Sequence, residues 1–435
     1  LEVKKLTEKI NKQEALIEEI KNNAIYRNAF EWRFEFPEVL DNEGNFEGFD
    51  IIVGNPPYIN ANDLKKSLTE EAYKFLKSNF QTAKGTVDLF IYFFEKGLKL
   101  LKANAPLSYI TPNRYLSASY GEALRGYIYK ETFISEIVDY SHVKVFEEAS
   151  TYPIVTTLIK QPTNEVTYPI KIGKYNATND NIDFKMITSE KLNLLEGYIW
   201  GYLLNDKIKI TEKIISKSVS ITKCAEINAT STASEADEYG KLINEKAGYK
   251  LINTGTIDSY MSLWGKSELT DKGRKFLKPY LPKGNKVISS NREKLYSSPK
   301  IILAKIAIRT EAFFDAEGEY ASINTNCFHS FSKDYEPKYI LAWLNSKLFQ
   351  YCFECFFEGL KMQGGYLLYS APNVSKMSIK AIAKKEQTQF ISIVDKIIAN
   401  KIQDKNSENE EKKLDFLFYN LFELTEEEIK IVEGN

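Results

Sequence analysis

A short apolar run that is soon followed by two prolines sets the strongest constraint on how this chain can fold. Ile51-Ile52-Val53 has the composition of a buried strand, and Gly54-Asn55-Pro56-Pro57-Tyr58 follows directly. Proline has no N–H for a sheet and does not fit the interior of a helix, so the chain must leave the strand in a stiff loop. Open α/β sheets bind their ligands beyond the carboxyl ends of the strands. The run therefore predicts an α/β fold with a rigid loop at a ligand-binding position.

The groups on this loop suit a planar substrate that carries an amino group. The side-chain oxygen of Asn55 and the carbonyl of Pro56 can each accept a hydrogen bond, and the ring of Tyr58 offers a face for stacking. Both acceptors would push electron density onto the amino nitrogen. A plain turn is the alternative interpretation, because Asn-Pro and Pro-Pro are ordinary loop dipeptides.

Residues 49–58 resemble the catalytic motif of the S-adenosylmethionine-dependent N6-adenine DNA methyltransferases, and specifically of the long type IIG enzymes of restriction-modification systems. Other segments are similar to landmarks that accompany this motif in the family: Phe30-Glu31-Trp32, residues 35–40, 85–90 and 108–113, Leu124-Arg125, and Val145-Phe146 before residues 153–155. Downstream, Thr254-Gly255, residues 299–303 and residues 343–346 resemble landmarks of the family's target-recognition domain.

The resemblance implies a site-specific DNA methyltransferase that transfers a methyl group from S-adenosylmethionine to N6 of a flipped-out adenine. Asn55, Pro56, Pro57 and Tyr58 would form the catalytic loop, and Phe146 would stack on the face of the base opposite Tyr58. Flipping costs a few kcal/mol, which stacking offsets at roughly 1 to 3 kcal/mol per base. Ser150 and Thr151 could help to hold the base, although ordinary polar turn residues are the simpler interpretation.

The elements that should bind the cofactor are missing from the sequence. In this class a strand with a glycine-rich turn, followed by an acidic residue for the ribose hydroxyls, precedes the catalytic loop. No two of the 21 glycines have the spacing Gly-x-Gly. We therefore expect the carboxyl-terminal portion of a larger protein, or one half of a split one, that lacks its main S-adenosylmethionine-binding motif and could be inactive as an isolated portion. An upstream methyltransferase or nuclease portion, or a partner subunit, would complete it.

Charge is distributed unevenly along the chain. The net charge is -1, yet residues 261–310 contain twelve Lys or Arg and only three Asp or Glu. Such a stretch favours a phosphate backbone, so we expect double-stranded DNA as a partner; a solvated, lysine-rich face is the alternative. Lys305 and Arg309 bracket a predicted strand, and Lys361 and Gln363 adjoin Gly364-Gly365. These four are candidates for contact with DNA in a groove, while phosphate contact suits the lysines equally.

The pattern of apolar residues predicts four parts, which the family resemblance implies to be the following. Residues 1–29 form a linking helix, and residues 30–162 form the second half of a doubly wound, Rossmann-like methyltransferase sheet with an unpaired edge. Residues 163–380 form a mixed α+β target-recognition domain, and residues 381–435 a helical segment. Strands are predicted at 49–54, 107–111, 134–140, 154–160, 299–308 and 319–330. Helices are predicted at 70–79, 87–102 and 337–357, a loop at 228–238, and an N-cap at Thr425.

Several classes of protein do not fit the sequence. No apolar stretch has the length of a membrane helix and no signal sequence opens the chain, so we expect a cytoplasmic protein without a membrane partner. The pair Cys352 and Cys355 lacks two further zinc ligands, and His142 and His329 are too few for a histidine-based metal site, so no metal is expected. Two alternatives stay open: a non-catalytic DNA specificity module, and a methyltransferase that acts on RNA or protein.

Overall fold

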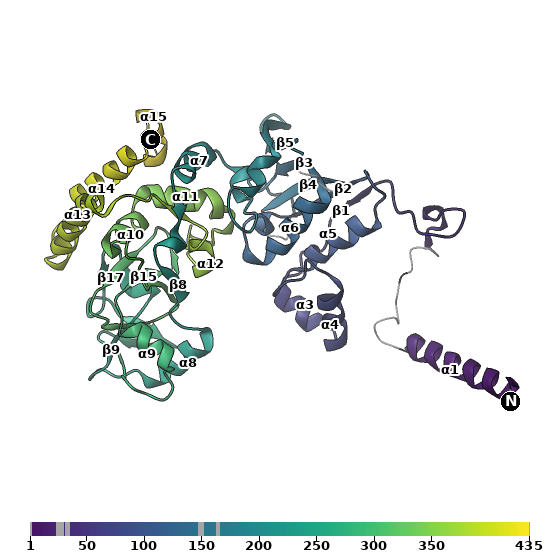
Figure 1. The fold of residues 1–435 in the computed structure, drawn as a ribbon, viewed down its shortest axis with the longest axis horizontal. Helices are drawn as coiled ribbons and strands as arrows, with labels where there is room; N and C mark the ends of the chain where they lie inside the picture. Colours follow the sequence, from purple (N-terminus) through teal and green to yellow (C-terminus); the bar gives the residue numbers. More distant parts are fainter. Residues whose placement is uncertain (1, 23–29, 31–34, 147–151, 162–165, 435) are drawn as a thin grey trace. The chain divides into compact units, whose positions relative to one another are not determined.

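The computed structural model describes residues 2–22, 30, 35–146, 152–161 and 166–434. Figure 1 shows the fold of the chain, which divides into two compact units. The first unit consists of Leu1–Tyr115 and Tyr120–Tyr198, and the second consists of Leu116–Ser119 and Ile199–Asn435. The four-part division predicted from the sequence is finer than these two units and stays a prediction.

A mixed six-stranded sheet forms the centre of the first unit. Its strands are β1 (Ile52–Gly54), β2 (Pro106–Pro112), β3 (Thr132–Asp139), β4 (Pro153–Lys160), β5 (Pro169–Asn176) and β6 (Asn181–Thr188), in the spatial order β1-β2-β4-β3-β5-β6. The pairs β1 with β2 and β3 with β5 are parallel, and the others are antiparallel. The four strands predicted in this region are present, and β5 and β6 extend the sheet beyond them.

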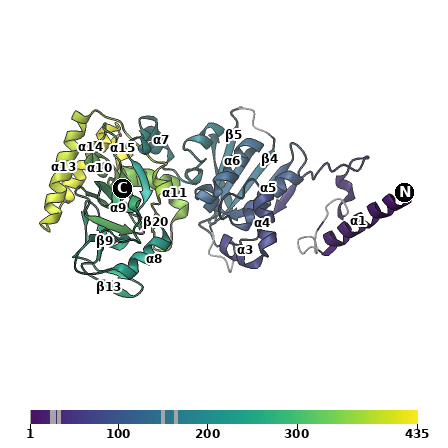
Figure 2. The ribbon, with the colours of Figure 1, turned by 60° about the horizontal axis from the view of Figure 1, so that its bottom comes forward.

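Helices cover this sheet because their apolar side chains repeat at helical spacing. The helices of the first unit are α1 (Glu2–Asn22), α3 (Ala61–Ser67), α4 (Glu70–Asn79), α5 (Leu89–Leu100) and α6 (Glu122–Glu131). Figure 2 shows α5 and α6 beside the strands, and α5 buries Phe90, Ile91, Phe94 and Leu98. The predicted helices at 70–79 and 87–102 are confirmed. Short 3₁₀ turns are η1 (Pro37–Val39), η2 (Asn113–Leu116), η3 (Ser119–Gly121) and η4 (Ser189–Asn193).

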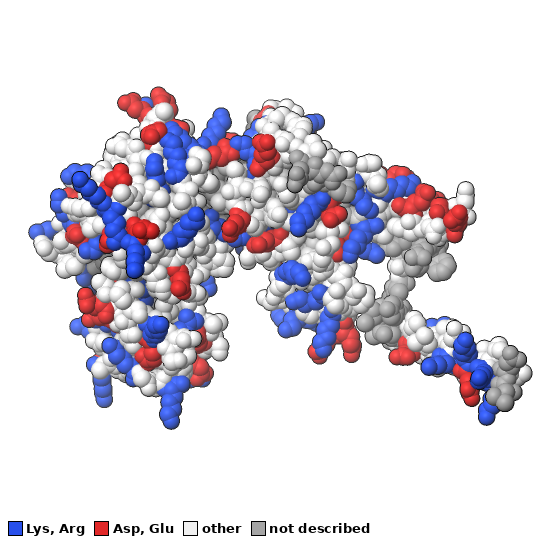
Figure 3. Space-filling view, viewed as in Figure 1, with Lys and Arg blue, Asp and Glu red and all other residues white. Residues whose placement is uncertain are grey.

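The helix α1 is exposed along its described length. Leu6, Ile10 and Ile17 are all exposed, and Figure 3 shows basic and acidic side chains mixed along the same helix. Pairs of opposite charge at helical spacing support such a solvated helix.

The prediction that residues 51–53 are buried is wrong. Ile51 is 58% exposed and Val53 is 72% exposed. The reason is that β1 is an edge strand, paired only with β2 among the residues that the structure describes. A run of three apolar residues predicts a strand, but it does not specify which chain covers the strand.

The second unit is also mixed α/β. Its larger sheets are β17-β15-β19-β8 and β14-β9-β18, and its short pairs are β10-β11, β12-β13, β16-β20 and β21-β7. The strands are β7 (Val219–Ser220), β8 (Glu226–Ala229), β9 (Tyr249–Asn253), β10 (Ile257–Asp258), β11 (Met261–Ser262), β12 (Leu269–Asp271), β13 (Arg274–Phe276), β14 (Tyr280–Leu281), β15 (Lys300–Ala304), β16 (Ile306–Ala307), β17 (Ala312–Asp315), β18 (Tyr320–Ile323), β19 (Thr325–His329), β20 (Leu367–Leu368) and β21 (Ser378–Ile379).

The helices of the second unit surround these sheets. They are α7 (Ile208–Ser216), α8 (Ala233–Leu242), α9 (Ser290–Tyr296), α10 (Pro337–Leu344), α11 (Lys347–Phe357), α12 (Ala371–Val374), α13 (Lys384–Ile402), α14 (Glu408–Leu421) and α15 (Glu426–Glu433), with 3₁₀ turns η5 (Gly201–Leu204), η6 (Ile221–Lys223), η7 (Thr254–Thr256) and η8 (Glu358–Leu360). The N-cap predicted at Thr425 is confirmed, since its side chain accepts a hydrogen bond from Glu428 N.

Two predictions for this unit need correction. The predicted loop at 228–238 contains part of β8 and the start of α8, because the Ser and Thr residues cap a helix: Thr232 and Glu235 form a capping box. The predicted helix at 337–357 is interrupted, since α10 ends before Asn345 and α11 begins after its N-cap, Ser346.

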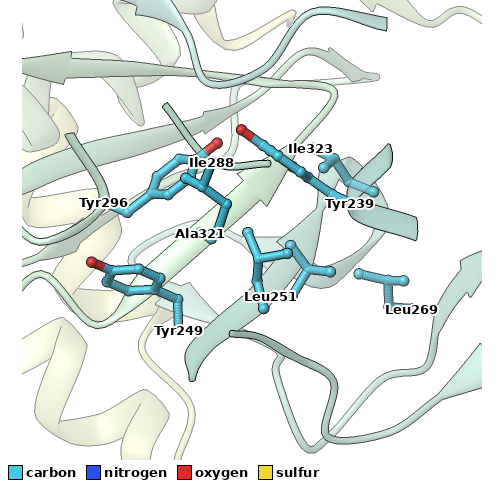
Figure 4. Packing of buried hydrophobic residues seen from close by; sticks show 9 residues of the cluster. Tyr239, Tyr249, Leu251, Leu269, Ile288, Tyr296, Ala321 and Ile323 are labelled. Carbon is cyan, nitrogen blue, oxygen red and sulfur yellow. The ribbon is translucent and has the colours of Figure 1, made fainter. Parts of the chain in front are cut away.

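One buried cluster packs α8 and α9 against the sheet β14-β9-β18. Figure 4 shows Tyr239, Tyr249, Leu251 and Tyr296 within this cluster, whose remaining members are Leu269, Leu281, Ile288, Ala321 and Ile323. The hydroxyl of Tyr296 donates to the carbonyl of Thr230 at 2.7 Å, and the hydroxyl of Tyr249 donates to the Glu293 carboxylate at 2.6 Å. These bonds satisfy polar atoms that burial would otherwise leave without partners.

The helix α11 carries both cysteines of the Cys-x-x-Cys pair. Cys352 and Cys355 are buried, and burial raises the pKa of each thiol, to about 12 for Cys355. Among the residues that the structure describes, no group of three or more His, Cys, Asp or Glu is placed to hold a metal ion. In the described part of the chain, no helix combines the length and apolar character needed to cross a bilayer.

Asp415 on α14 should make the stability of the second unit depend on pH. Its Oδ1 accepts a hydrogen bond from Lys347 N at 2.9 Å, and burial raises the pKa of this carboxyl to about 7. Between these two pKa values, 3.8 in the unfolded chain and about 7 in the folded one, the folded state keeps a proton that the unfolded chain has lost. The stability from this proton is fully present below the unfolded pKa and is lost as pH rises through the folded one, at up to about 1.4 kcal/mol per pH unit.

We expect Asp415→Asn to flatten this dependence, because the amide keeps the acceptor and cannot ionise. Urea unfolding at pH 5, 6, 7 and 8 measures the slope. Glu408→Gln, an exposed carboxylate on the same helix, is the matched control and should keep the wild-type slope. Equal slopes for wild type and Asp415→Asn would contradict the prediction.

Candidate functional site

The loop after β1 is held at its entry by close packing against β2. Gly54 lies opposite Tyr109 in the parallel register, and a Cβ at Gly54 would lie 3.1 Å from the Tyr109 ring. Gly97 on α5 makes room for the other end of this ring, since a Cβ there would lie 2.5 Å from the Tyr109 hydroxyl. Glycine at 54 thus lets the strand approach Tyr109 closely before the loop begins.

Hydrogen bonds fasten the exit of the loop to the start of α5. Leu89 N donates to the carbonyl of Ile59 at 2.9 Å, and Ala61 N donates to Asp88 Oδ1 at 3.0 Å. Asn60 caps α3 by accepting bonds from Asn62 N and Asp63 N. Because both ends are fastened and two prolines lie between them, the loop is stiff. Asp88 is a positioning residue that the sequence analysis did not single out.

The loop presents its amide to solvent. Asn55 and Pro57 are exposed, Pro56 is buried, and Tyr58 is half-buried. The exposed carboxamide of Asn55 can therefore receive a ligand from outside the sheet. Burial of Pro56 fixes the peptide that follows Asn55.

The structure brings Tyr58 and Phe146 together although they are 88 positions apart in the chain. Their ring centroids lie 5.8 Å apart at an interplanar angle of 88°. Burial raises the pKa of Tyr58 to about 12, so its hydroxyl stays neutral near pH 7. The two rings touch, and a planar base can lie between them only when they separate.

Polar atoms at the end of β2 form a second part of this region. Thr111 Oγ1 and Asn113 Oδ1 are buried, as is the Tyr58 hydroxyl, and none of the three has a hydrogen-bond partner among the described residues. The strands β1 and β2 are parallel, so their carboxyl ends meet at one edge of the sheet. An unsatisfied buried polar atom costs about 1 to 3 kcal/mol, which makes these atoms positions for a ligand or an ordered water. Sequence analysis had treated Thr111 and Asn113 as landmarks only.

Other predicted residues lie elsewhere or are not described. Ser150 and Thr151, Glu31 and Trp32, and the predicted boundary at 162–164 lie outside the residues that the structure describes. His142 Nε2 lies at hydrogen-bond distance from the carbonyl of Tyr175, which gives this histidine a structural partner.

The four candidates for DNA contact lie in two segments of the second unit that meet in one pair of strands. Lys305 and Arg309 flank β16, and Lys361 and Gln363 precede β20, which pairs with β16 in antiparallel register. The backbone carbonyl of Lys305 accepts a hydrogen bond from Tyr369 N at 2.9 Å. Two segments that were predicted separately therefore form a single surface.

The basic stretch at 261–310 is not a continuous basic face. Lys300 is buried and paired with Asp315, and Arg292 forms a bidentate pair with Glu235. Five other cations are paired with acids, namely Lys266 with Asp404, Lys272 with Asp237, Arg274 with Asp271, Lys275 with Glu268 and Arg309 with Asp258. Figure 3 accordingly shows blue and red side chains interspersed over the visible face of the second unit. Several of the acids come from outside the stretch, so counting charges along the sequence overestimated its field.

Known protein families match one segment in each of the two units. Residues 1–146 match the family described as Eco57I restriction-modification methylase, and residues 249–367 match the TaqI-like C-terminal specificity domain. One segment of the chain is thus similar to restriction-modification methylases, and another is similar to a specificity domain. This confirms the family resemblance that the sequence motifs indicated.

Curated relatives of the chain agree with these family matches. It is 27% identical over 172 residues to the type II restriction enzyme and methyltransferase RM.Eco57I of Escherichia coli, a match that covers 39% of this chain and 17% of the relative. It is 27% identical over 155 residues to the type II methyltransferase M.XhoI of Xanthomonas vasicola, covering 35% and 28%. The matched segments thus span less than a third of either relative.

Among solved structures, the type IIL restriction-modification enzyme MmeI in complex with DNA is similar to this chain, and the alignment covers 93% of this chain and 58% of the MmeI chain. The TM-score is 0.48 and the sequence identity is 12%.

Proposed function

We propose that this chain is the carboxyl-terminal part of a site-specific DNA methyltransferase of the type IIG kind, which methylates N6 of adenine in double-stranded DNA as part of a restriction-modification system. One observation carries the proposal: a stiff Asn-Pro-Pro-Tyr loop at the carboxyl end of β1 exposes the Asn55 amide, with Tyr58 in contact with Phe146. The match of residues 1–146 to a methylase family supports it.

In the proposed mechanism the target adenine leaves the base stack, because its amino group cannot be reached inside a duplex. Tyr58 and Phe146 separate and stack on its two faces. Asn55 Oδ1 and the Pro56 carbonyl accept hydrogen bonds from the two amino hydrogens and direct the nitrogen lone pair toward the methyl donor. When bound, S-adenosylmethionine supplies an activated methyl group for in-line displacement. After it accepts the methyl group the amino nitrogen releases one proton to water, so no covalent intermediate on the protein and no strong general base is needed.

The first unit is proposed to be the second half of a doubly wound sheet, which an upstream portion or a partner subunit completes. The exposed side chains of Ile51 and Val53 support this, since a free edge with large apolar residues favours pairing with another chain. The described residues before β1 form only α1 and η1, which do not provide the strand and glycine-rich turn of a nucleotide site. The missing half is therefore proposed to hold most of the cofactor.

The remaining assignments follow from this function. We propose residues 1–29 as a linking helix, residues 30–162 as catalytic, residues 163–380 as the part that recognises the DNA sequence, and residues 381–435 as a helical segment. Lys305, Arg309, Lys361 and Gln363 are proposed to contact DNA, and the location is proposed to be cytoplasmic.

The proposal predicts that the chain alone does not bind S-adenosylmethionine with a Kd below about 1 mM, and that it binds once joined to the region encoded directly upstream. Isothermal titration calorimetry of both proteins measures this. Saturable binding by the chain alone would contradict the missing-half proposal. With the joined protein and labelled cofactor, N6-methyladenine in duplex DNA is the expected product; label in RNA or protein instead would overturn the substrate assignment.

A second candidate function is a DNA specificity module without catalysis. The match of residues 249–367 to a specificity domain favours it. The joined protein separates the two, because a module would bind duplex DNA and leave it unmethylated.

A further inference from the structure

Two short strands of the second unit form a ribbon with one buried and one exposed face. In the pair β16-β20, Ala307 lies opposite Leu367 and Ile306 lies opposite Leu368. Directly opposed residues share a face, and Ala307 and Leu367 are both buried. Ile306, on the other face, is 40% exposed. We call residues 305–309 and 361–369 the ribbon.

The exposed face of the ribbon is apolar. Ile308 lies in the bend directly after β16 and is 58% exposed. Tyr366 and Met362 at the turn are 43% and 37% exposed. The described residues of the second unit contain nine large apolar side chains with comparable exposure, and four of them lie on this ribbon. Such a concentration marks an interaction surface.

Hydrogen bonds hold the base of the ribbon in place. Gln350 on α11 accepts bonds from Thr310 N at 3.2 Å and from the Tyr369 hydroxyl at 2.5 Å, and its Nε2 donates to the carbonyl of Ile308 at 3.4 Å. Thr254 Oγ1 accepts a bond from Lys305 N at 3.2 Å. The apolar face is therefore presented by a fastened element, which lowers the entropy lost on binding.

The tip of the ribbon is a tight turn that needs glycine. Met362 N donates to the carbonyl of Tyr366 at 2.8 Å, and Gly365 N donates to the carbonyl of Met362 at 3.0 Å. Gly364 and Gly365 have φ values of 83° and 82°, which other residues rarely adopt. Gln363 and Met362 are thereby held at the end of the ribbon.

Cationic and amide side chains surround the apolar face. Lys305 and Arg309 lie at the ends of β16, and Lys361 and Gln363 lie at the tip. Arg309 lies 3.8 Å from Asp258, and Lys361 donates to Glu358 at 3.2 Å and lies 3.7 Å from Glu354. DNA phosphates would therefore compete with these acids for the two cations. A rim of cations around an apolar centre complements DNA, whose phosphates flank base edges that carry thymine methyl groups.

We propose that the ribbon enters the major groove of the DNA duplex and contacts the C5 side of pyrimidines with Ile306, Ile308 and Tyr366. The major groove has the width to admit a two-stranded ribbon, and apolar side chains recognise the methyl group of thymine there. Gln363 at the tip reaches an adjacent base edge, and the rim cations neutralise phosphates. The inference rests on the proposed function, since it takes duplex DNA as the partner, and it adds a specificity-determining apolar surface to the charged contacts.

Photocrosslinking tests the placement. Duplexes that the full chain enriches from a randomised pool are remade with 5-iodouracil or 5-iodocytosine at each pyrimidine in turn, so that every base pair presents iodine in the major groove. We expect at least one position to crosslink to a peptide within residues 305–309 or 361–369. Crosslinks confined to peptides outside the ribbon would overturn the inference.

Substitution tests the energetic contribution. Ile308→Ser and Tyr366→Ser are expected to weaken binding to the enriched duplex about ten- to hundredfold, because each well-placed base contact discriminates to that extent. Phe416→Ser, an exposed apolar residue on α14 outside the ribbon, is the control and should bind as wild type. Thermal unfolding of the variants verifies that they are folded.

The outcomes separate this inference from the proposed function. If the wild-type chain binds duplex DNA and both ribbon variants bind equally well, only the ribbon inference fails. If the wild-type chain binds no duplex DNA, the DNA partner in the proposed function fails and the ribbon inference fails with it.

Discussion

Replacing Asn55 by Ala is expected to slow methyl transfer by about 100- to 1000-fold, the loss found when one transition-state hydrogen bond is removed from an active site. The Asn55 amide is exposed at the end of a stiff loop, so its removal deletes an acceptor without disturbing a core. The binding of DNA should stay nearly unchanged, because the proposed contacts outside the flipped base lie in the second unit and the two stacking rings remain. Single-turnover transfer from labelled cofactor, with the chain joined to its upstream region, measures the rate.

Asn60→Ala is the matched control for this experiment. Asn60 belongs to the same loop region and caps α3, so its loss should cost about 1 kcal/mol of stability while the rate of transfer stays close to wild type. An Asn55→Ala protein that methylates DNA at the wild-type rate would remove the loop from the mechanism. A rate loss of equal size in both variants would indicate distortion of the loop instead of a role for the amide.

The local features of the catalytic loop could be predicted from the sequence, because they depend on neighbouring residues. Two prolines after a β-rich run require a stiff exit from a strand, and the structure has β1 followed by such a loop. The burial of that strand could not be predicted in the same way. Ile51 and Val53 have the composition of a covered strand, yet their exposure depends on whether another chain pairs with β1.

The relations between distant residues needed coordinates. Family resemblance indicated Tyr58 and Phe146 as partners, and the structure places their rings in contact. The unsatisfied atoms of Thr111 and Asn113 cannot be recognised in a sequence, because satisfaction depends on every neighbour in space. The basic stretch shows the same limit, since the acid that neutralises Lys266 is Asp404, far along the chain.

Lys300→Met is expected to destabilise the second unit by about 3 to 5 kcal/mol, because it leaves a buried carboxylate without its cation. The Lys300 and Asp315 side chains are 0% and 2% exposed, and Lys300 Nζ donates to Asp315 Oδ2 at 2.5 Å. Burial lowers the pKa of Lys300, whereas the neighbouring carboxylate of Asp315 raises it. Each charge is therefore stable in the interior only because the other is present. Urea unfolding followed by tryptophan fluorescence measures the loss, since Trp264 and Trp343 lie in this unit.

The double variant Lys300→Met/Asp315→Leu distinguishes the cost of an unpaired charge from the loss of packing. Removing both charges replaces a buried ion pair by apolar side chains, which is often neutral or stabilising, so most of the lost stability should return. Asp315 also accepts bonds from Glu319 N and Tyr320 N, and these two amides lose their acceptor in the double variant. Recovery is therefore expected to stop about 1 to 3 kcal/mol short of wild type. A Lys300→Met variant as stable as wild type would contradict the prediction that the buried carboxylate of Asp315 needs this cation.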